Sequence, residues 1–118
     1  MRVLLVDDEQ ELVATLAERL EMRGIEAAWA VDWPGAQALL QKQDFDIALL
    51  DVRLAELNGL ELKRRIEALY PQMKFIFLTG HGSEDDFNAC SAEKGCTDYL
   101  IKPVQIDILI QKLQESVQ

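Results

Sequence analysis

Three aspartates, one threonine and one lysine follow short apolar runs in this sequence. They are Asp7, Asp8, Asp51, Thr79 and Lys102. Carboxylates at close range repel one another, and a hard divalent cation such as Mg²⁺, which prefers oxygen ligands, relieves that repulsion. A carboxylate can also attack phosphorus and form an aspartyl phosphate, a reaction that needs positioned positive charge. The residue types therefore predict a Mg²⁺ site at the three aspartates, beside a lysine and a hydroxyl that bind a phosphoryl group.

For this chemistry the five side chains must meet, and the apolar runs indicate where. Short apolar runs bounded by polar residues are typical of strands buried on both faces. The carboxyl ends of parallel strands share one edge of the sheet, where open α/β folds bind ligands. The runs are residues 3–6, 27–31 (the weakest), 47–50, 75–78 and 99–101.

Helical patterns separate these runs. Asp32 with Pro34, and Ser83 followed by three acidic residues, are helix start signals, whereas Gly24 and Pro71 are stop signals. Strand and helix alternate five times, which predicts a doubly wound five-stranded parallel sheet of the α/β class. Apolar residues recur at helical spacing within 12–20, 36–40, 62–69 and 106–117.

Each polar residue also has a simpler interpretation when it is taken alone. Asp7 or Asp8 could cap the first helix, Thr79 could belong to a turn, and Lys102 could be a solvated surface charge. Such residues at the ends of four strands are hard to obtain by chance. We therefore favour one functional cluster.

Five segments resemble response-regulator receiver domains of two-component signalling. They match in the right order over essentially the whole chain, and residues 78–83 look like receivers of enhancer-binding transcription activators. The resemblance implies a single flavodoxin-like (βα)5 domain over residues 1–118, with strand order 2-1-3-4-5. The segments are Val6-Asp7-Asp8-Glu9, Leu50-Asp51, Asn58-Gly59, Leu78-Thr79-Gly80 and Asp98-Tyr99-Leu100-Ile101-Lys102-Pro103.

The resemblance implies that Asp51 is the phosphoacceptor. It also implies that Asp7, Asp8 and Asp51, with the backbone carbonyl of Arg53, hold Mg²⁺. The donor would be a sensor histidine kinase or a phosphotransfer protein. Such a domain is not a turnover enzyme, but it promotes its own phosphoryl transfer and dephosphorylation. Phosphorylation would switch a face formed by the fourth helix, the fifth strand and the fifth helix, which would bind a second copy or an effector domain.

Further positions take their roles from the same resemblance. Thr79 and Lys102 match the phosphoryl-binding pair, and Tyr99 matches the aromatic residue that changes rotamer on activation. Gly59 and Pro103 match structural positions. The Lys102–Pro103 peptide bond is usually cis in the family, which would aim the ammonium group into the cleft.

One departure and three competing functions follow from the same positions. Family members usually carry a proline where this chain has Ala55, so a more mobile loop is expected over residues 54–57.

A phosphatase with an aspartate nucleophile is the first competing function. Such an enzyme usually has a second aspartate where this chain has Arg53. A flavodoxin-like cofactor binder is the second alternative, but the acidic residues 7–9 would repel the phosphate of such a cofactor unless a metal lay between them. A receiver-like module that never takes phosphate is disfavoured because all the key positions are filled.

Length, charge and cysteine content narrow the remaining choices. With 118 residues the chain has the size of one domain. A net charge of −9 and a pI of about 4.5 argue against direct nucleic-acid binding. The apolar run at residues 3–6 is too short for a signal peptide or a membrane span, so a cytoplasmic location is expected. Cys90 and Cys96 are expected to be ordinary thiols.

Several other residues are assigned to packing or to solvent. The basic run 63–65 is interpreted as a solvated helix face. His81 is expected to be a solvated loop residue, and Trp29 and Trp33 to take part in packing. Ile108 lies off the main apolar stripe of the last helix and is expected to be exposed.

Overall fold

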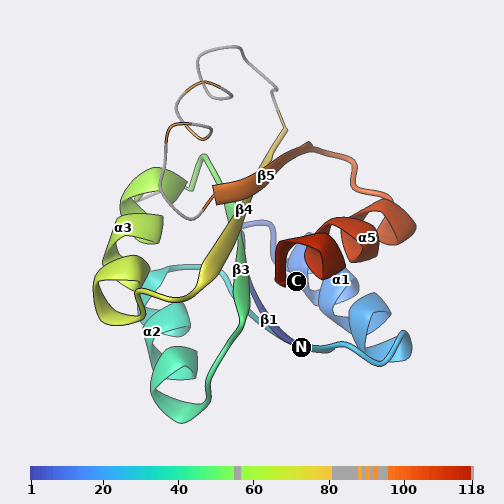
Figure 1. Cartoon of the computed structure of the whole chain (residues 1–118), viewed down its shortest axis with the longest axis horizontal. Helices are drawn as coiled ribbons and strands as arrows, with labels where there is room; N and C mark the ends of the chain where they lie inside the picture. Colours follow the sequence, from blue (N-terminus) through green and yellow to red (C-terminus); the bar gives the residue numbers. More distant parts are fainter. Residues whose placement is uncertain (55–56, 81–87, 89, 91, 93–95, 118) are drawn as a thin grey trace.

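The computed structural model describes residues 1–54, 57–80, 88, 90, 92 and 96–117. Its centre is a five-stranded parallel sheet with the strand order β2-β1-β3-β4-β5, which confirms the predicted doubly wound fold (Figure 1). The apolar runs predicted each strand to within a few residues. The strands are β1 (Arg2–Val6), β2 (Glu26–Ala30), β3 (Ile47–Asp51), β4 (Lys74–Thr79) and β5 (Cys96–Ile101).

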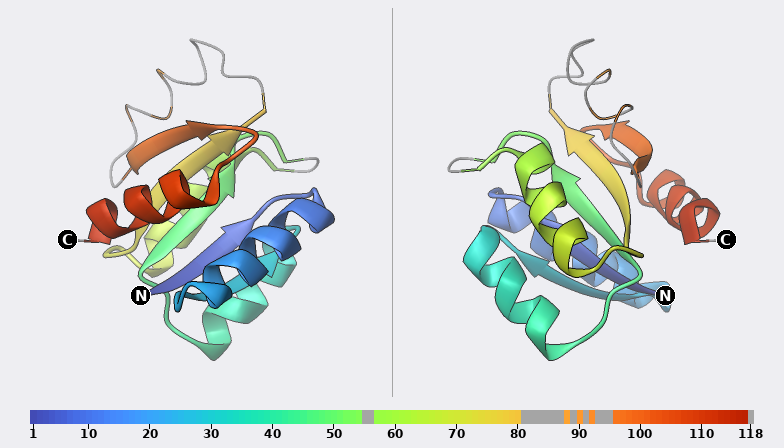
Figure 2. Two further views of the ribbon diagram at one scale, coloured as in Figure 1. Left: turned by 90° about the vertical axis from the view of Figure 1, so that its right-hand side faces the viewer. Right: turned by 60° about the vertical axis from the view of Figure 1, so that its left-hand side comes forward.

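Helices cover both faces of the sheet. Figure 2 shows α1 and α5 on one face and α2 and α3 on the other. Of the residues in the helix predicted after Ser83, only a few are described, so this prediction lies outside the described residues. No helix in the described part of the chain is long and apolar enough to cross a lipid bilayer. The helices are α1 (Gln10–Met22), α2 (Trp33–Lys42), α3 (Gly59–Leu69) and α5 (Ile106–Val117).

The buried strands divide the core into two clusters. Every residue of β3 is buried, and its side chains alternate between the two faces of the sheet. On one face, Leu4 and Phe75 pack with residues of α2 and α3. On the other face, Leu5 and Ile76 pack with residues of α1 and α5. The central strands are therefore packed against helices on both sides.

Local signals explain most helix ends. Asp32 caps α2 by accepting a hydrogen bond from Gly35 N at 2.8 Å, and Asn58 caps α3 by accepting one from Glu61 N at 2.8 Å. Gly24 ends the first helical segment with a φ of +81°, as its stop signal predicted.

The suggestion that Asp7 or Asp8 caps α1 is wrong. The N-cap residue is Glu9, and no side chain makes a capping hydrogen bond there. Asp7 Oδ1 instead accepts a hydrogen bond from Glu9 N at 2.9 Å, so Asp7 closes the turn that enters the helix. This geometry leaves Asp7 Oδ2 available for another contact.

The prediction of a solvated basic face over residues 63–65 is wrong at Lys63. This side chain is buried, and its ammonium lies 3.0 Å from Glu67 Oε2 and 5.6 Å from the centre of the Phe75 ring. A lysine stem is apolar, so it can pack against a strand while its charge finds a partner. Arg64 and Arg65 are exposed, as expected, and the Arg65 guanidinium lies over the Trp33 ring.

Candidate metal and phosphoryl-binding site

The sheet brings the predicted side chains to one edge. Asp7 directly follows β1, Asp51 ends β3, Thr79 ends β4 and Lys102 directly follows β5. These strands are neighbours, with Val6 beside Leu50, Asp51 beside Leu78 and Thr79 beside Ile101. The parallel sheet therefore places residues from four distant parts of the sequence at adjacent strand ends.

Asp7, Asp8 and Asp51 form an acidic cluster. Each of the three offers a carboxylate oxygen, and these oxygens lie within 4.8 Å of one another. Asp7 and Asp51 are buried, with 1% and 5% of their surface exposed, whereas Asp8 is exposed. A set of oxygen donors at this spacing fits a hard divalent cation such as Mg²⁺. The predicted ligand triad is therefore assembled.

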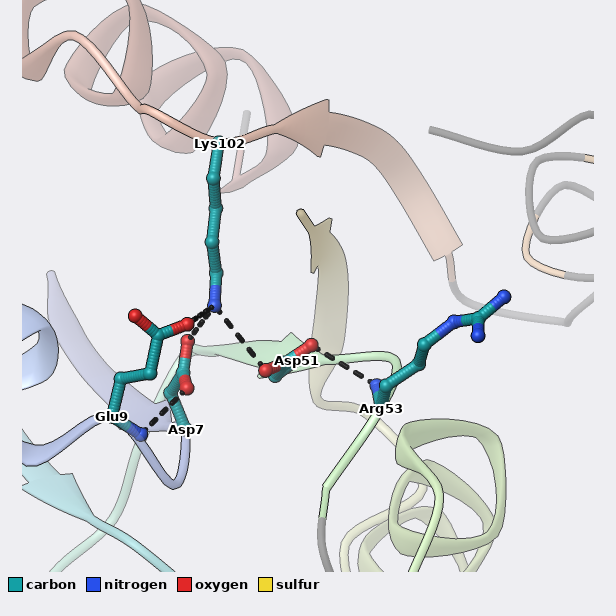
Figure 3. Close-up of polar contacts among 5 residues, drawn as sticks. All are labelled: Asp7, Glu9, Asp51, Arg53 and Lys102. Atoms are coloured by element: carbon teal, nitrogen blue, oxygen red, sulfur yellow. Dashed lines mark hydrogen bonds and ion pairs between the residues drawn. The ribbon is translucent and has the colours of Figure 1, made fainter. Parts of the chain in front are cut away.

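Lys102 reaches into this cluster from the end of β5 (Figure 3). Its Nζ lies 2.7 Å from Asp7 Oδ2, 2.7 Å from Glu9 Oε1 and 3.3 Å from Asp51 Oδ2. The Lys102 side chain is 13% exposed and lies between the buried carboxylates of Asp7 and Asp51 and the exposed carboxylate of Glu9. One ammonium group thus partly neutralises three carboxylates.

Burial and charge pairing act together on the titration of this pair. Burial raises the pKa of Asp7 above its ordinary value, although the hydrogen bonds from Lys102 and from Glu9 N oppose this. Burial also disfavours the Lys102 ammonium, but Asp7, Glu9 and Asp51 outweigh it and raise the pKa of Lys102 above its ordinary 10.5. Lys102 is therefore a permanent cation at neutral pH.

The two oxygens of Asp51 have different surroundings. Oδ1 accepts a hydrogen bond from Arg53 N at 3.0 Å, and Oδ2 faces Lys102. The Arg53 side chain points away from the cluster in Figure 3, so this residue meets Asp51 through its backbone. The proposed metal contact of the Arg53 carbonyl stays a prediction.

The segment after Asp51 is tied to the sheet by its backbone. Val52 N donates to Leu78 O at 2.9 Å, and Gly59 N donates to Val52 O at 2.7 Å. Gly59 packs so closely that a Cβ there would overlap the carbonyl oxygen of Asp51 and lie 2.9 Å from Val52 Cα. A glycine at position 59 therefore lets the start of α3 sit directly against the phosphoacceptor candidate.

The other predicted positions lie on β4 and β5. Thr79 is fully buried, and its carbonyl accepts a hydrogen bond from Lys102 N at 2.7 Å. The Lys102–Pro103 peptide bond is cis, as expected. Tyr99 packs against the core cluster on the α2–α3 side, with its hydroxyl oxygen buried. Ala55 and His81 lie outside the described residues.

Sequence reasoning missed Glu9 as part of this site. The sequence shows Glu9 as an acidic residue after the two aspartates but does not predict that its carboxylate contacts Lys102, which is 93 positions away. Its place two residues after Asp7 is the one signal that could have suggested the contact. A side chain at a strand–helix junction can point in several directions, so this spacing alone does not predict an ion pair.

Comparisons with known proteins agree with this geometry. Residues 3–114 match the family model for the response regulator receiver domain. The crystal structure of a CheY-like response regulator receiver domain protein from Methanospirillum hungatei is similar, with a TM-score of 0.87 and 31% identity. That similarity covers 98% of this chain and 92% of the solved chain.

Curated relatives are transcriptional regulators. The alginate biosynthesis transcriptional regulatory protein AlgB of Pseudomonas aeruginosa is 41% identical over 109 residues, which are 92% of this chain and 24% of that protein. The transcriptional regulatory protein GlrR of Escherichia coli is 32% identical over 116 residues, which are 98% of this chain and 26% of that protein. The chain thus spans about a quarter of the length of these relatives.

Proposed function

The chain belongs to the response-regulator receiver family of two-component signal transduction, and on this premise we propose that Asp51 accepts a phosphoryl group from a histidine kinase or a phosphotransfer protein. The observation that carries the proposal is the position of Asp51. It is buried at the end of the central strand β3, within reach of two further aspartates and 3.3 Å from a lysine ammonium.

The proposed reaction is transfer from phosphohistidine to the Asp51 carboxylate. An O–P bond forms at Asp51 while the N–P bond of the donor breaks, and its electron pair returns to the imidazole nitrogen. Asp7, Asp8, Asp51 and the Arg53 carbonyl would hold Mg²⁺, which when bound supplies positive charge to the phosphoryl oxygens. Lys102 adds a second positive charge, and the Thr79 hydroxyl hydrogen-bonds a phosphoryl oxygen. The domain is a phosphoacceptor rather than a turnover enzyme.

The proposed output is a change on the face that contains β5 and α5, together with the predicted fourth helix. Thr79 moves toward the phosphoryl group, and Tyr99 on the neighbouring strand changes its rotamer. Ile101 on β5 and Ile108 on α5 are 56% and 44% exposed, which supports a role of this face in contacts with another protein. The exposure of Ile108 confirms the sequence-based expectation.

The partners and setting of the domain belong to the same proposal. Residues 1–118 form one receiver domain that acts in the cytoplasm and binds a second copy or an effector domain through the switched face. A net charge of −9 supports the absence of direct nucleic-acid contact.

Acetyl phosphate is a suitable small donor for the test. We expect the intact mass to increase by one phosphoryl group when the protein is incubated with acetyl phosphate and Mg²⁺. The Asp51→Asn variant, and the wild-type protein in the presence of a chelator, should stay unlabelled. Equal labelling of the variant, or labelling without a divalent cation, would overturn the assignment.

A further inference from the structure

Glu9 carries a carboxylate that the proposed chemistry does not use. Its side chain is 61% exposed, and its Oε1 lies 2.7 Å from Lys102 Nζ. Its backbone forms the N-cap of α1, but its side chain makes no capping hydrogen bond. The one contact described for this carboxylate is therefore the ion pair with Lys102, and the start of the helix does not depend on it.

Lys102 and a divalent cation would share the same two carboxylates. The lysine ammonium lies on Asp7 Oδ2 and close to Asp51 Oδ2, and both aspartates belong to the acidic cluster. Two cations near shared carboxylates repel each other, strongly so where water is largely excluded. If Lys102 had only Asp7 and Asp51 as partners, a divalent cation bound to both would weaken the attraction that holds the ammonium at the site.

Glu9 is the third partner and lies outside the acidic cluster that could hold a metal. We propose that Glu9 is a positioning residue that keeps the Lys102 ammonium beside the site when a divalent cation occupies Asp7 and Asp51. The inference rests on the proposed Mg²⁺ site. In this role Glu9 reduces the competition between the Lys102 ammonium and the divalent cation, the two positive charges that phosphoryl transfer needs.

The backbone of Lys102 supports this role because it restricts where the ammonium can go. Lys102 N donates to Thr79 O at 2.7 Å, which fixes the start of the side chain at the end of β4. From this anchor the ammonium reaches Glu9 and Asp7 at the same distance of 2.7 Å. Lys102 can therefore shift its charge toward Glu9 with a small movement.

The test is a double-mutant cycle on Mg²⁺ affinity, measured by titration calorimetry on the whole chain. We expect Glu9→Gln to weaken Mg²⁺ binding by about two- to five-fold, the size of a partly exposed ion pair. In a Lys102→Met background the same Glu9→Gln change should have little effect, because the competing cation is gone. Lys102→Met alone should tighten Mg²⁺ binding.

Glu11→Gln is the matched control. Glu11 is exposed in the first turn of the same helix, and it carries the same charge without contacting Lys102. We expect this variant to bind Mg²⁺ nearly as tightly as the wild type. Circular dichroism of every variant establishes that the fold is retained, and Glu9→Gln is expected to fold because the exposed side chain caps nothing.

The outcomes separate this inference from the proposed function. If the wild type does not bind Mg²⁺, the proposed metal site fails. If the wild type binds Mg²⁺ but Glu9→Gln weakens binding equally in the presence and absence of Lys102, Glu9 acts only as a nearby charge and the positioning role is overturned. The positioning role is also overturned if Glu9→Gln does not change the Mg²⁺ affinity, or if Glu11→Gln lowers that affinity as much as Glu9→Gln does.

Discussion

At the scale of single residues, the main electrostatic feature of the site is Lys102, which places one positive charge among three carboxylates. Burial alone would make the ammonium unfavourable, but the carboxylates outweigh burial and raise the pKa of Lys102 above 10.5. The lysine is thus held in its charged form next to the residue that is proposed to carry about two negative charges after phosphorylation. Charge complementarity is present before any phosphoryl group arrives.

The raised pKa of Lys102 predicts a specific pH dependence of stability. Because the folded chain holds this proton more tightly than the unfolded chain, the stabilisation is complete below pH 10.5 and is lost as the pH rises toward the folded-state pKa. We expect the free energy of unfolding of the metal-free protein, measured by denaturant titration, to fall above that pH. Lys102→Met should show a smaller fall, since it lacks the ammonium group that gives rise to this pH dependence. Parallel pH profiles would contradict the prediction.

Most residues of the site could be predicted from the sequence, whereas the contacts of one site residue and one α3 residue could not, for a shared reason. The aspartates, Thr79 and Lys102 were predictable because each follows a short apolar run that forms a strand. Glu9 and Lys63 have long side chains whose charged ends lie several ångströms from the backbone. Residue type and spacing do not reveal where such an end finds its partner. Lys63 buries its apolar stem and pairs with Glu67, which a count of basic residues cannot show.

At the scale of elements, the connection from β3 to α3 controls the geometry around Asp51. Asn58 caps α3, and Gly59 then brings the first turn of the helix against the backbone of Asp51. The hydrogen bond from Gly59 N to Val52 O fixes this contact at 2.7 Å. The position of Asp51 therefore depends on a close backbone approach at a residue that takes no part in the proposed chemistry.

Replacing Gly59 with alanine should disturb this contact. The added Cβ would overlap the Asp51 carbonyl, so α3 or β3 has to shift, and we expect a loss of about 1–3 kcal/mol in the free energy of unfolding. Gly80→Ala is the control, because a Cβ there meets nothing within 4 Å. We expect that variant to change stability by less than about 0.5 kcal/mol. Denaturant titration of both variants tests the prediction, and a neutral Gly59→Ala would contradict it.

The strands and helices were predictable because the apolar pattern is strong where both faces of the sheet are covered. Edge strands were less clear. β5 begins at Cys96, three residues before the predicted run. The prediction began too late because the polar residues Thr97 and Asp98 interrupt the apolar pattern. Asp98 pairs with Lys112 on α5 at 3.2 Å, so a polar residue in this strand is satisfied by a helix. An apolar pattern cannot detect a strand residue of this kind.

At the scale of the whole molecule, the sheet separates two layers of helices, and the site lies where the strands end, close to the edge strand β5. Alternation of strands and helices predicted the α/β class, but the strand order 2-1-3-4-5 came from the family resemblance, since alternation allows several orders. The structure places β5 at the edge, beside β4 and next to Lys102. Ile101 is exposed; it pairs with Thr79 on the neighbouring strand β4 and directly precedes Lys102, so a change at either residue lies next to it.

This arrangement predicts that phosphorylation is felt beyond the site. We expect backbone amide NMR signals of β5 and α5 to shift when Asp51 is phosphorylated, and sedimentation to show a larger assembly or a captured partner. Thr79→Ala should still accept the phosphoryl group but give smaller shifts in α5, because the hydroxyl that couples the phosphoryl group to β5 is missing. Shifts confined to the three aspartates and Lys102, with an unchanged assembly state, would contradict the switch.

Asp51, rather than Asp7 or Asp8, is proposed to carry the phosphoryl group, and locating the label on the chain tests this assignment directly. Borohydride reduces an acyl phosphate to an alcohol, so it converts a phosphorylated aspartate into homoserine at the labelled position. After phosphorylation by acetyl phosphate and reduction, peptide mass spectrometry should find homoserine at position 51 and unchanged aspartate at positions 7 and 8. Homoserine at position 7 or 8, or at none of the three in a protein that has gained phosphate, would contradict the account.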